Sequence, residues 1–505
     1  MHPSNFATSK PEHPAIIMAS TGIKISYAEL EMRSNACAHL LRRQGLTKGQ
    51  GIAILMDNSR YFLEVCWAAQ RSGLYFTCVP THLNAEEAEY IIRDCGALAV
   101  FFNSATKDVG KELAARLSPT VHSYSVECEI DGCTPYSELC QSMPNTPVSD
   151  ESSGRDMLYS SGTTGKPKGV KIPLSDEPIS FMNPMQIQTQ VQYGFGEDTV
   201  YLCPAPLYHA APLRVTMLIQ RLGGTAVILD KFHAETALRT IDQYQVTHSQ
   251  WVPTMFVRML KLKKETRAKF ALDSQRVAIH AAAPCPQDIK RQMIDWWGPI
   301  IHEYYSGSEP CGLCCIDSQQ WLENPGSVGP AVFGSLHVLD EAGNELPAFQ
   351  EGLIYFSGGL EFQYHGDPQK TKEAKNEKGW VTLGDIGYVD EKQYLYLTDR
   401  ASNVIISGGV NIYPQECEDL LLTHDSVLDV AVIGVSNADF GEEVKAFVQL
   451  VDPAEAGPHL EQVLLDFCRD SLSPVKCPRS VDFIETLPRQ ANGKLYKRLL
   501  KESHS

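Results

Sequence analysis

Strand-like and helix-like segments alternate near the start of the chain, and this alternation limits the folds that it can adopt. A Ser-x-x-Glu capping box at Ser26 opens a helical pattern that runs to Gly45, and Asn84 opens a second one. A further helical pattern covers 61–70, and short apolar runs indicate buried strands at 51–56, 74–79 and 97–102. The alternation predicts right-handed β-α-β units around a mainly parallel sheet, and so an α/β fold.

The length of the chain predicts more than one domain. At 505 residues it exceeds the size at which a single hydrophobic core stops growing. A second, smaller unit begins at about residue 400, with its own strand patterns at 430–435 and 444–450 and a helical pattern at 460–472. We therefore expect an N-terminal domain of residues 1–399 and a C-terminal domain of residues 400–505.

Composition excludes several classes of partner. The 44 basic and 61 acidic residues give a net charge of −17, which disfavours nucleic acid. Fifteen scattered cysteines indicate reduced thiols in a cytoplasmic protein, and the cluster Cys311-Gly-Leu-Cys314-Cys315 is more typical of buried thiols than of a zinc site. The first residues lack the pattern of a signal peptide, and no apolar run is long enough to predict a transmembrane helix.

Residues 159–170, Tyr-Ser-Ser-Gly-Thr-Thr-Gly-Lys-Pro-Lys-Gly-Val, combine glycines, hydroxyls and lysines on one short loop. Glycines let backbone amides turn toward one point, while hydroxyl and ammonium groups add donors and positive charge. This pattern predicts a polyphosphate site; a plain flexible turn would need no lysines. Pro167 prevents an immediate helix, so the loop is not a Walker A motif. The expected phosphate-binding residues are Ser160, Ser161, Gly162, Thr163, Thr164, Gly165 and Lys166.

This loop resembles the phosphate-binding signature of the adenylate-forming superfamily, which includes acyl- and aryl-CoA synthetases, luciferases and peptide-synthetase adenylation domains. Further matches follow in the family's order, so the resemblance covers about residues 20 to 500. It implies a large multi-sheet α/β N-terminal domain of the acyl-CoA synthetase type and a small mobile α+β C-terminal domain. It also implies ATP, Mg²⁺ and coenzyme A as cofactors, and a homodimer as a family-level expectation.

Three further segments match the nucleotide-binding motifs of the family. In Glu303-Tyr-Tyr-Ser-Gly-Ser-Glu309, the resemblance implies that Tyr305 stacks on adenine, Ser308 contacts phosphate and Glu309 holds Mg²⁺ together with Thr164. Small residues of 280–284 would let the nucleotide lie against the backbone. A carboxylate and an arginine further along would bind the ribose or phosphate. The remaining residues that the resemblance assigns to ATP are Ala282, Ala283, Pro284, Glu303, Tyr304, Asp385 and Arg400.

The acyl substrate should lie beside Pro-Leu-Tyr-His209, because in the family this position forms a gate next to the substrate carboxylate. A lone histidine is otherwise more often structural. The pocket residues that we expect are His209, Trp251, Ala281, Gly307, Pro310 and Cys311. All are neutral, which argues against an amino-acid substrate and favours a medium-chain or aryl acid. The methyl group of Ala281 should narrow the tunnel slightly.

Two C-terminal segments match the moving parts of the family. Residues 397–416 contain a hinge near Ser402 and a glycine turn, where the resemblance assigns Ser407, Gly408 and Gly409 to coenzyme A. A purely structural glycine turn is the alternative. Pro488-Arg-x-x-x-Gly-Lys494 matches the terminal motif, so Lys494 should bridge the carboxylate and the α-phosphate. The catalytic residues would be Lys494, Glu309, His209 and Thr164.

Together these patterns predict an ATP-dependent acid–CoA ligase. A carboxylate would attack the α-phosphorus of ATP and release pyrophosphate, and the thiol of coenzyme A would then displace AMP. An enzyme that loads a carrier-protein pantetheine, a luciferase-like oxygenase and a nucleotide-binding regulator without turnover are the alternatives. The regulator has no need for both Lys494 and Glu309.

Overall fold

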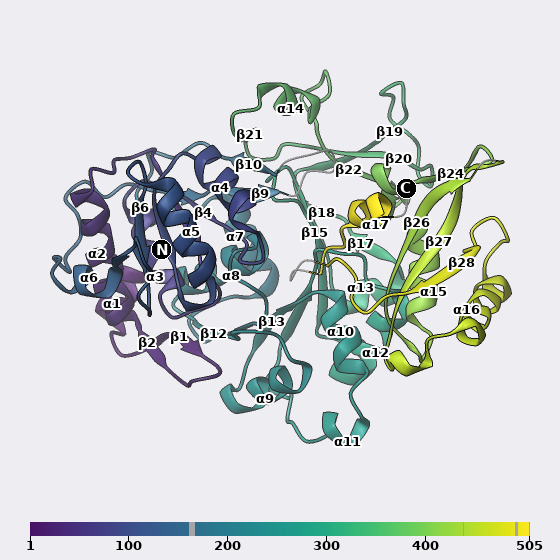
Figure 1. The fold of residues 1–505 in the computed structure, drawn as a ribbon, viewed down its shortest axis with the longest axis horizontal. Helices are drawn as coiled ribbons and strands as arrows, with labels where there is room; N and C mark the ends of the chain where they lie inside the picture. The colour runs from purple at the N-terminus through teal and green to yellow at the C-terminus, as the bar shows by residue number, and fades with distance from the viewer. Residues whose placement is uncertain (161–166, 438, 490–492, 504–505) are drawn as a thin grey trace.

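The computed structural model describes residues 1–160, 167–437, 439–489 and 493–503. Figure 1 shows an N-terminal lobe in purple and blue, a central body in teal and green, and a C-terminal unit in yellow-green on the opposite side. The chain forms several separate sheets covered by helices, which confirms the expected multi-sheet α/β class.

The helices lie between and over the sheets, and those opened by capping boxes begin where the sequence indicates. Ser26 and Asn84 both accept a hydrogen bond from the backbone of their first turn. The helices are α1 Pro3–Ser9, α2 Tyr27–Arg43, α3 Phe62–Arg71, α4 Ala85–Asp94, α5 Lys107–Leu117, α6 Tyr136–Gln141, α7 Pro184–Tyr193, α8 Ala210–Arg221, α9 Ala234–Tyr244, α10 Pro253–Leu260, α11 Lys264–Arg267, α12 Gln287–Trp297, α13 Ser318–Glu323, α14 Pro368–Glu373, α15 Pro414–Leu422, α16 Pro458–Ser471 and α17 Lys497–Ser503.

The N-terminal lobe is built on a parallel sheet in the order β7-β6-β5-β3-β4-β8. Its strands are β3 Gly51–Leu55, β4 Tyr75–Cys78, β5 Ala97–Phe102, β6 His122–Ser125, β7 Thr134–Pro135 and β8 Arg155–Asp156. The three strands expected from apolar runs are confirmed, and they pair in parallel because a helix returns the chain between each strand and the next.

The largest sheet runs through the body of the molecule in the order β18-β16-β15-β14-β13-β11-β12-β1-β2. Strands β11, β13, β14 and β15 are parallel neighbours, so their carboxyl ends meet at one edge and place the loops that follow them side by side. The strands are β1 Pro14–Met18, β2 Lys24–Ser26, β11 Val200–Cys203, β12 Thr225–Ile228, β13 His248–Trp251, β14 Val277–His280, β15 Ile301–Tyr305, β16 Leu313–Ile316 and β18 Ala331–Phe333.

Two smaller antiparallel sheets complete the body. One, in the order β21-β10-β9, pairs the two strands that flank the glycine-rich motif. The other runs β17-β23-β22-β20-β19 and sets Asp385 opposite Arg400. Their strands are β9 Leu158–Ser160, β10 Lys168–Lys171, β21 Gln363–Tyr364, β17 Ser327–Gly329, β19 Ser335–Leu339, β20 Gly352–Ser357, β22 Val381–Val389 and β23 Leu395–Arg400.

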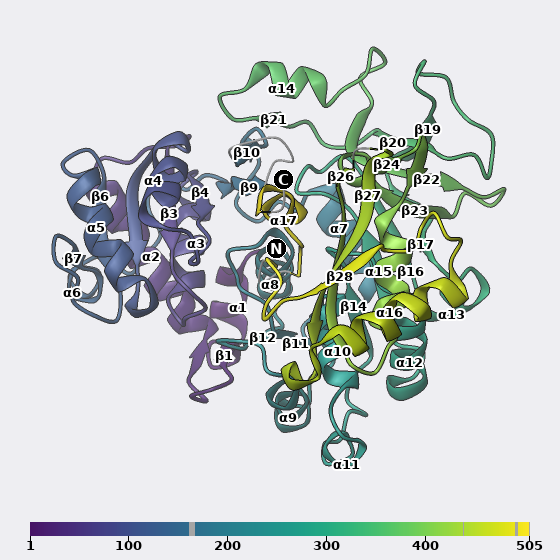
Figure 2. The same cartoon turned by 45° about the vertical axis from the view of Figure 1, so that its right-hand side comes forward.

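The C-terminal segment has its own sheet, in the order β25-β24-β27-β26 with β28 beside β27. Its core packs Val430, Val432, Ala446 and Val448 of the sheet against Leu464 of α16. Helix α17 packs on this unit, where its Leu500 joins a cluster with Ala431 and Ile433 of β26. Figures 1 and 2 show it at the edge of the unit that is nearest the body of the molecule. The strands are β24 Ile405–Ser407, β25 Val410–Ile412, β26 Val427–Asn437, β27 Gly441–Leu450 and β28 Ser480–Phe483. The boundary at residue 400 stays a prediction.

All fifteen cysteines are free thiols, which is what their scattered spacing indicates. Among the helices that the structure describes, none combines the length and the apolar character that a bilayer crossing requires.

Candidate functional site

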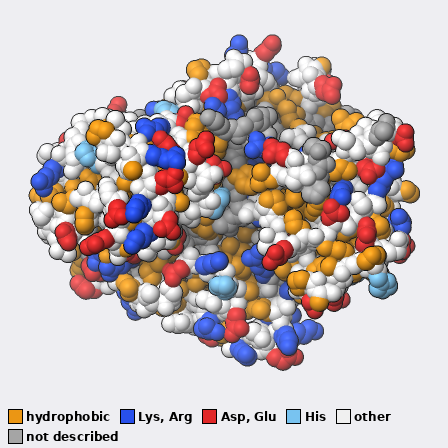
Figure 3. All heavy atoms as spheres, in the orientation of Figure 1, with side chains coloured by type: hydrophobic (Ala, Val, Ile, Leu, Met, Phe, Trp, Pro, Cys, Tyr) orange, Lys and Arg blue, Asp and Glu red, His pale blue; other side chains and the backbone are white. Residues whose placement is uncertain are grey.

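A cavity of about 830 Å³ opens at the edge where the parallel strands of the largest sheet end. The surface is hollowed near the centre of the face in Figure 3. Loops after β11, β13, β14 and β15 supply much of the cavity wall, and the C-terminal segment contributes Arg489, Lys494, Leu495 and Lys497. Most expected site residues line this one space: His209, Trp251, Ala281, Ala282, Ala283, Pro284, Glu303, Tyr304, Tyr305, Gly307, Ser308, Glu309, Pro310, Asp385, Arg400 and Lys494.

Tyr305, Asp385 and Arg400 form a connected group on one wall. The Tyr305 hydroxyl donates to Asp385 Oδ2 at 2.6 Å, and Arg400 Nε lies 3.1 Å from Asp385 Oδ1. The carboxylate is therefore fixed from both sides and cannot turn freely. A fixed acceptor flanked by an aromatic ring and a guanidinium is suited to a nucleoside, because it offers a ring face, a hydroxyl acceptor and a positive charge together.

Glu309 is buried, with 8% of its surface exposed. Tyr364 on β21 donates its hydroxyl to Glu309 Oε1 at 2.7 Å, which leaves the second oxygen for another partner. Because β21 pairs with β10, this hydrogen bond also ties the glutamate to the strand that follows the glycine-rich motif. Sequence analysis missed Tyr364, because it stands 55 residues from its partner along the chain.

Lys494 reaches the cavity from the C-terminal segment. Its pKa is lowered to about 8, mainly by burial and also by the positive charge of Arg400, while Glu309 and Asp385 act in the opposite direction. The preceding Gly493 has a positive φ of 81° and packs close to Val252, to which a Cβ at position 493 would come within 3.1 Å. A side chain there would push the lysine segment away from the body.

Glu303 lines the cavity, but its carboxylate belongs to a buried ion pair. Lys290 Nζ lies 2.6 Å from Glu303 Oε2, and the side chains are 0% and 8% exposed respectively. His280 Nε2 lies 3.5 Å from the same oxygen. Burial raises the pKa of Glu303, whereas the Lys290 charge lowers it. The pair joins α12 to β15, so Glu303 stabilises the packing of this helix on the sheet as well as lining the cavity.

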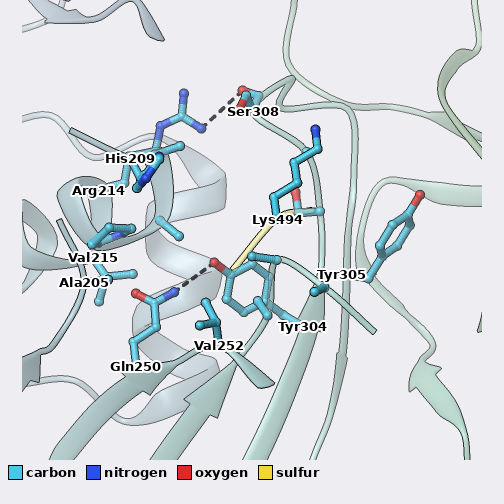
Figure 4. Close-up of a pocket in the computed structure, with 18 of the residues that line it drawn as sticks. Ala205, His209, Arg214, Val215, Gln250, Val252, Tyr304, Tyr305, Ser308 and Lys494 are labelled. Carbon is cyan, nitrogen blue, oxygen red and sulfur yellow. Dashed lines mark hydrogen bonds between the residues drawn. The ribbon is translucent and has the colours of Figure 1, made fainter. Parts of the chain in front are cut away.

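The cavity also contains an ion pair that the sequence analysis missed. Arg214 on α8 donates to Asp156 Oδ2 from Nε at 3.0 Å and from Nη2 at 2.8 Å. Its Nη1 donates to the carbonyl of Ser308 at 3.2 Å, as Figure 4 shows. Burial would raise the pKa of Asp156, but Arg214 and Arg155 outweigh this and hold it low. The pocket is therefore not lined by neutral residues alone, although the opposite charges of Arg214 and Asp156 cancel each other.

The wall expected for the acyl group carries polar atoms as well as apolar ones. Burial, with a smaller contribution from His82, lowers the pKa of His209 to about 3, so the imidazole is neutral at neutral pH. On the opposite side, Gln250 Nε2 donates to the Tyr304 hydroxyl at 2.9 Å (Figure 4). Ala282 has a left-handed φ of 76°, an unusual conformation for alanine that is often found at functional sites.

The structure describes only part of the glycine-rich motif. Ser161, Gly162, Thr163, Thr164, Gly165 and Lys166 lie outside the described residues, and Ser160 ends β9. After the motif, Lys168 Nζ lies 3.1 Å from Asp367 Oδ2, so this lysine is already paired. The strands on both sides of the motif pair directly, and Tyr159 of β9 lines the cavity. The phosphate-binding role of the loop stays a prediction.

Outside the glycine-rich motif, four of the expected site residues that the structure describes do not line the cavity. Gly408 and Gly409 form a two-residue turn between β24 and β25, with φ values of 58° and 81° that suit glycine, and Ser407 precedes them. The turn is exposed and lies beside Phe440, Ile406 and Val410, which are also exposed. Cys311 is the fourth; it is 1% exposed in the core beneath the cavity. Ser402 is exposed in a short 3₁₀ turn.

Within the described residues, no group of three or more histidine, cysteine or acidic side chains is arranged to hold a metal ion. A metal bound mainly by nucleotide phosphates would need only one or two protein carboxylates. Glu309, with one oxygen held by Tyr364, fits such a role, and the other expected ligand, Thr164, falls outside the described residues.

Known proteins share both the sequence and the fold of this chain. The family model for the AMP-binding enzyme matches residues 4–362, and that for the AMP-binding enzyme C-terminal domain matches residues 416–494. The long-chain-fatty-acid–CoA ligase FadD13 of Mycobacterium tuberculosis is 29% identical, over 99% of this chain and 97% of that protein. The feruloyl-CoA synthase of an Amycolatopsis species is 30% identical, over 94% and 93% respectively.

A solved structure resembles the whole chain. The o-succinylbenzoate CoA synthetase (MenE) of Bacillus subtilis, in complex with the acyl-adenylate intermediate OSB-AMP, is 25% identical. It has a TM-score of 0.83 and covers 99% of this chain and 97% of its own. Together with the two family models and the single cavity that joins their motifs, this likeness shows that the chain belongs to the AMP-binding enzymes of the adenylate-forming superfamily, in the branch of acyl- and aryl-CoA synthetases.

Proposed function

We propose that this protein is an AMP-forming acid–CoA ligase. A carboxylate oxygen of the acid attacks the α-phosphorus of ATP, the bond from that phosphorus to the bridging oxygen breaks, and pyrophosphate leaves. The thiolate of coenzyme A then attacks the acyl carbon, and AMP leaves with the oxygen. The observation that carries the proposal is that Lys494, Glu309 and Asp385 line one cavity although they come from three distant motifs.

Each of these side chains has a separate task in the first step. Asp385, fixed by Tyr305 and Arg400, would accept hydrogen bonds from the ribose. Lys494 would bring a positive charge between the carboxylate and the α-phosphate, two anions that otherwise repel each other. Glu309 and the hydroxyl of Thr164 would hold Mg²⁺, which neutralises phosphate charge when it is bound.

The arrangement of the C-terminal segment corresponds to the first step rather than the second. Lys494 lines the cavity, whereas Gly408 and Gly409 lie in an exposed turn beside apolar side chains that are themselves exposed. We propose that rotation near Ser402 withdraws Lys494 and brings this turn to the cavity, where it would admit the pantetheine arm. A turn without side chains leaves room for the thiol.

The acid is an uncharged fatty or aryl acid in this proposal. The relatives include ligases named for long-chain fatty acids and for a feruloyl group. The Asp156 carboxylate, which lines the cavity, is paired with Arg214, so it does not offer a partner for a substrate ammonium. Medium-chain and aryl acids remain the narrower prediction.

Pyrophosphate release measured with ATP, Mg²⁺ and a library of carboxylic acids, with and without coenzyme A, tests the proposal. Acid-dependent pyrophosphate and AMP with thioester formation are expected. Turnover that needs a phosphopantetheinyl carrier protein instead of coenzyme A would favour carrier loading, and oxygen-dependent light emission would favour a luciferase. ATP binding without any acid-dependent turnover would leave a regulator.

A pair of variants tests the division between the two steps. Lys494→Ala should lose adenylation but still form thioester from supplied acyl-AMP, and Gly409→Leu should do the reverse. Gly343→Leu is a matched control, because Gly343 has the same φ of 81° and the same open surroundings in a surface turn. Equal loss of both steps in the two site variants would contradict the proposal.

A cytosolic location and a homodimer are further predictions. Fifteen free thiols are typical of proteins kept in a reducing compartment. Fractionation of cells and light scattering of the purified protein would test the two predictions separately.

A further inference from the structure

Three side chains form a hydrogen-bonded row along the acyl side of the cavity. The Tyr201 hydroxyl donates to Gln250 Oε1 at 2.9 Å, and Gln250 Nε2 donates to the Tyr304 hydroxyl at 2.9 Å. Tyr201 and Gln250 stand on the neighbouring strands β11 and β13, and Tyr304 stands on β15. All three line the cavity, so the row ends at the space that the acid would fill.

The hydrogen bonds run from Tyr201 to Gln250 to Tyr304, so the hydroxyl proton of Tyr304 is not donated within the row. Tyr304 accepts from Gln250, and among the residues that the structure describes its own hydroxyl hydrogen has no acceptor. If the Gln250 amide were turned over, the unused proton would belong to Tyr201, which is 0% exposed. Tyr304 is partly exposed, and an unpaired donor costs more on a fully buried side chain than on a partly exposed one, so the direction from Tyr201 to Tyr304 is favoured.

The charges near Tyr304 are consistent with its role as a hydrogen-bond donor. Arg214 lies close enough to lower the pKa of the Tyr304 phenol, although burial dominates and raises it to about 12. The phenol therefore keeps its proton at any pH at which the enzyme would work. The Asp156 carboxylate is paired with Arg214, so it is not available to a cationic group of a substrate.

We propose that Tyr304 is a specificity-determining residue that donates its hydroxyl proton to an uncharged oxygen in the tail of the acid. The substrate class is then a fatty or aryl acid that carries a hydroxyl, ether or keto oxygen, rather than a plain hydrocarbon acid. Figure 4 shows the Tyr304 hydroxyl meeting Gln250 on the side of the cavity away from the Lys494 ammonium, where the tail and not the carboxylate would lie. This inference rests on the proposed acid–CoA ligase activity.

Pairs of acids that differ only in one oxygen test the inference. Hydroxyl and methyl groups are close in size, so 4-hydroxyphenylpropanoate is compared with 4-methylphenylpropanoate, and hydroxy fatty acids with methyl-ended ones, the oxygen being moved along the series. For at least one position, kcat/KM of pyrophosphate release should favour the oxygenated acid by about tenfold or more. No preference at any position would overturn the inference.

The variant Tyr304→Phe removes the proton and keeps the ring. Its ratio of kcat/KM values should fall to within about threefold of one, because kcat/KM for the oxygenated acid falls by more than kcat/KM for the methyl partner. Tyr388→Phe, a substitution of the same kind on β22 outside the cavity, should leave the wild-type ratio unchanged. A preference that persists in Tyr304→Phe would overturn the inference.

If Tyr304→Phe does not fold, Tyr201→Phe serves instead. Without the Tyr201 donor, Gln250 can turn its oxygen toward Tyr304, so the preference should again fall, and an unchanged preference would count against the inference. If the enzyme turns over many acids with equal kcat/KM whether or not the tail carries an oxygen, this inference alone is refuted. The absence of acid-dependent turnover would refute the proposed function, and this inference would fall with it.

Discussion

Arg489 and Asp429 form a two-pronged ion pair, with Nε to Oδ2 at 2.6 Å and Nη2 to Oδ1 at 2.8 Å. The same guanidinium donates to the carbonyl of Gly493 at 2.7 Å. Because Gly493 directly precedes Lys494, this arginine ties the lysine segment to β26. Bidentate pairs fix direction as well as distance, so the position of Lys494 depends on a residue that does not have to touch a substrate.

Replacement of Arg489 by methionine should therefore impair adenylation more than thioester formation. We expect kcat for acid-dependent pyrophosphate release to fall about tenfold to a hundredfold, since a misplaced charge stabilises the transition state less. Thioester formation from supplied acyl-AMP should change little. Arg498→Met, which removes an exposed pair with Glu502, is the matched control. Similar losses in both steps would contradict a positioning role.

Adenylation should weaken at alkaline pH because Lys494 has a lowered pKa of about 8. The ammonium form, which carries the useful charge, predominates below that pH and is lost as the pH rises through it. The profile of kcat/KM reports the free enzyme, so its alkaline limb should begin near pH 8. In Lys494→Arg the guanidinium stays charged, so any residual activity should lack this limb. If the alkaline decline of kcat/KM is unchanged in Lys494→Arg, a group other than Lys494 causes it.

Tyr364→Phe should raise the Mg²⁺ concentration needed for half-maximal adenylation by about fivefold, the effect of one lost hydrogen bond. The Tyr364 hydroxyl donates to Glu309 Oε1 and so orients the carboxylate. Without this hydrogen bond the carboxylate can rotate, and Oε2 no longer points steadily toward the metal. The KM for the acid serves as the internal control and should not move. Binding of Mn²⁺ in the presence of ATP, followed by electron paramagnetic resonance, should weaken in parallel.

Breaking the buried pair of Lys290 and Glu303 should destabilise the fold. Lys290→Met leaves a buried carboxylate without its partner, and the free energy of unfolding should fall by about 3–5 kcal/mol. The double variant Lys290→Met/Glu303→Gln should recover much of this loss, as urea unfolding would show. Lys48→Met, which removes an exposed pair with Asp176, should change the free energy of unfolding by about 1 kcal/mol or less. A double variant as unstable as Lys290→Met would mean that the cost arises from packing.

Much of the fold could be predicted from the sequence because local patterns specify local elements. The capping boxes at Ser26 and Asn84 mark the starts of α2 and α4, and the apolar runs mark β3, β4 and β5. Residues 103–156 have a mixed, polar composition without a clear period, so local patterns do not predict their elements. They contain α5, β6, β7, α6 and β8, where packing against neighbouring elements decides the structure.

The sequence by itself determined the class of chemistry, since the glycine-rich loop, the Glu309 motif and the Lys494 motif are each contiguous and match one family. Only the tertiary structure decided which side chains hold the site in place. Tyr364 and Glu309 are 55 residues apart, Arg214 and Asp156 are 58 apart, and Gln250 and Tyr304 are 54 apart. Such partners meet only because the folded chain brings separate sheets and helices together around one cavity, and no local sequence pattern predicts these contacts.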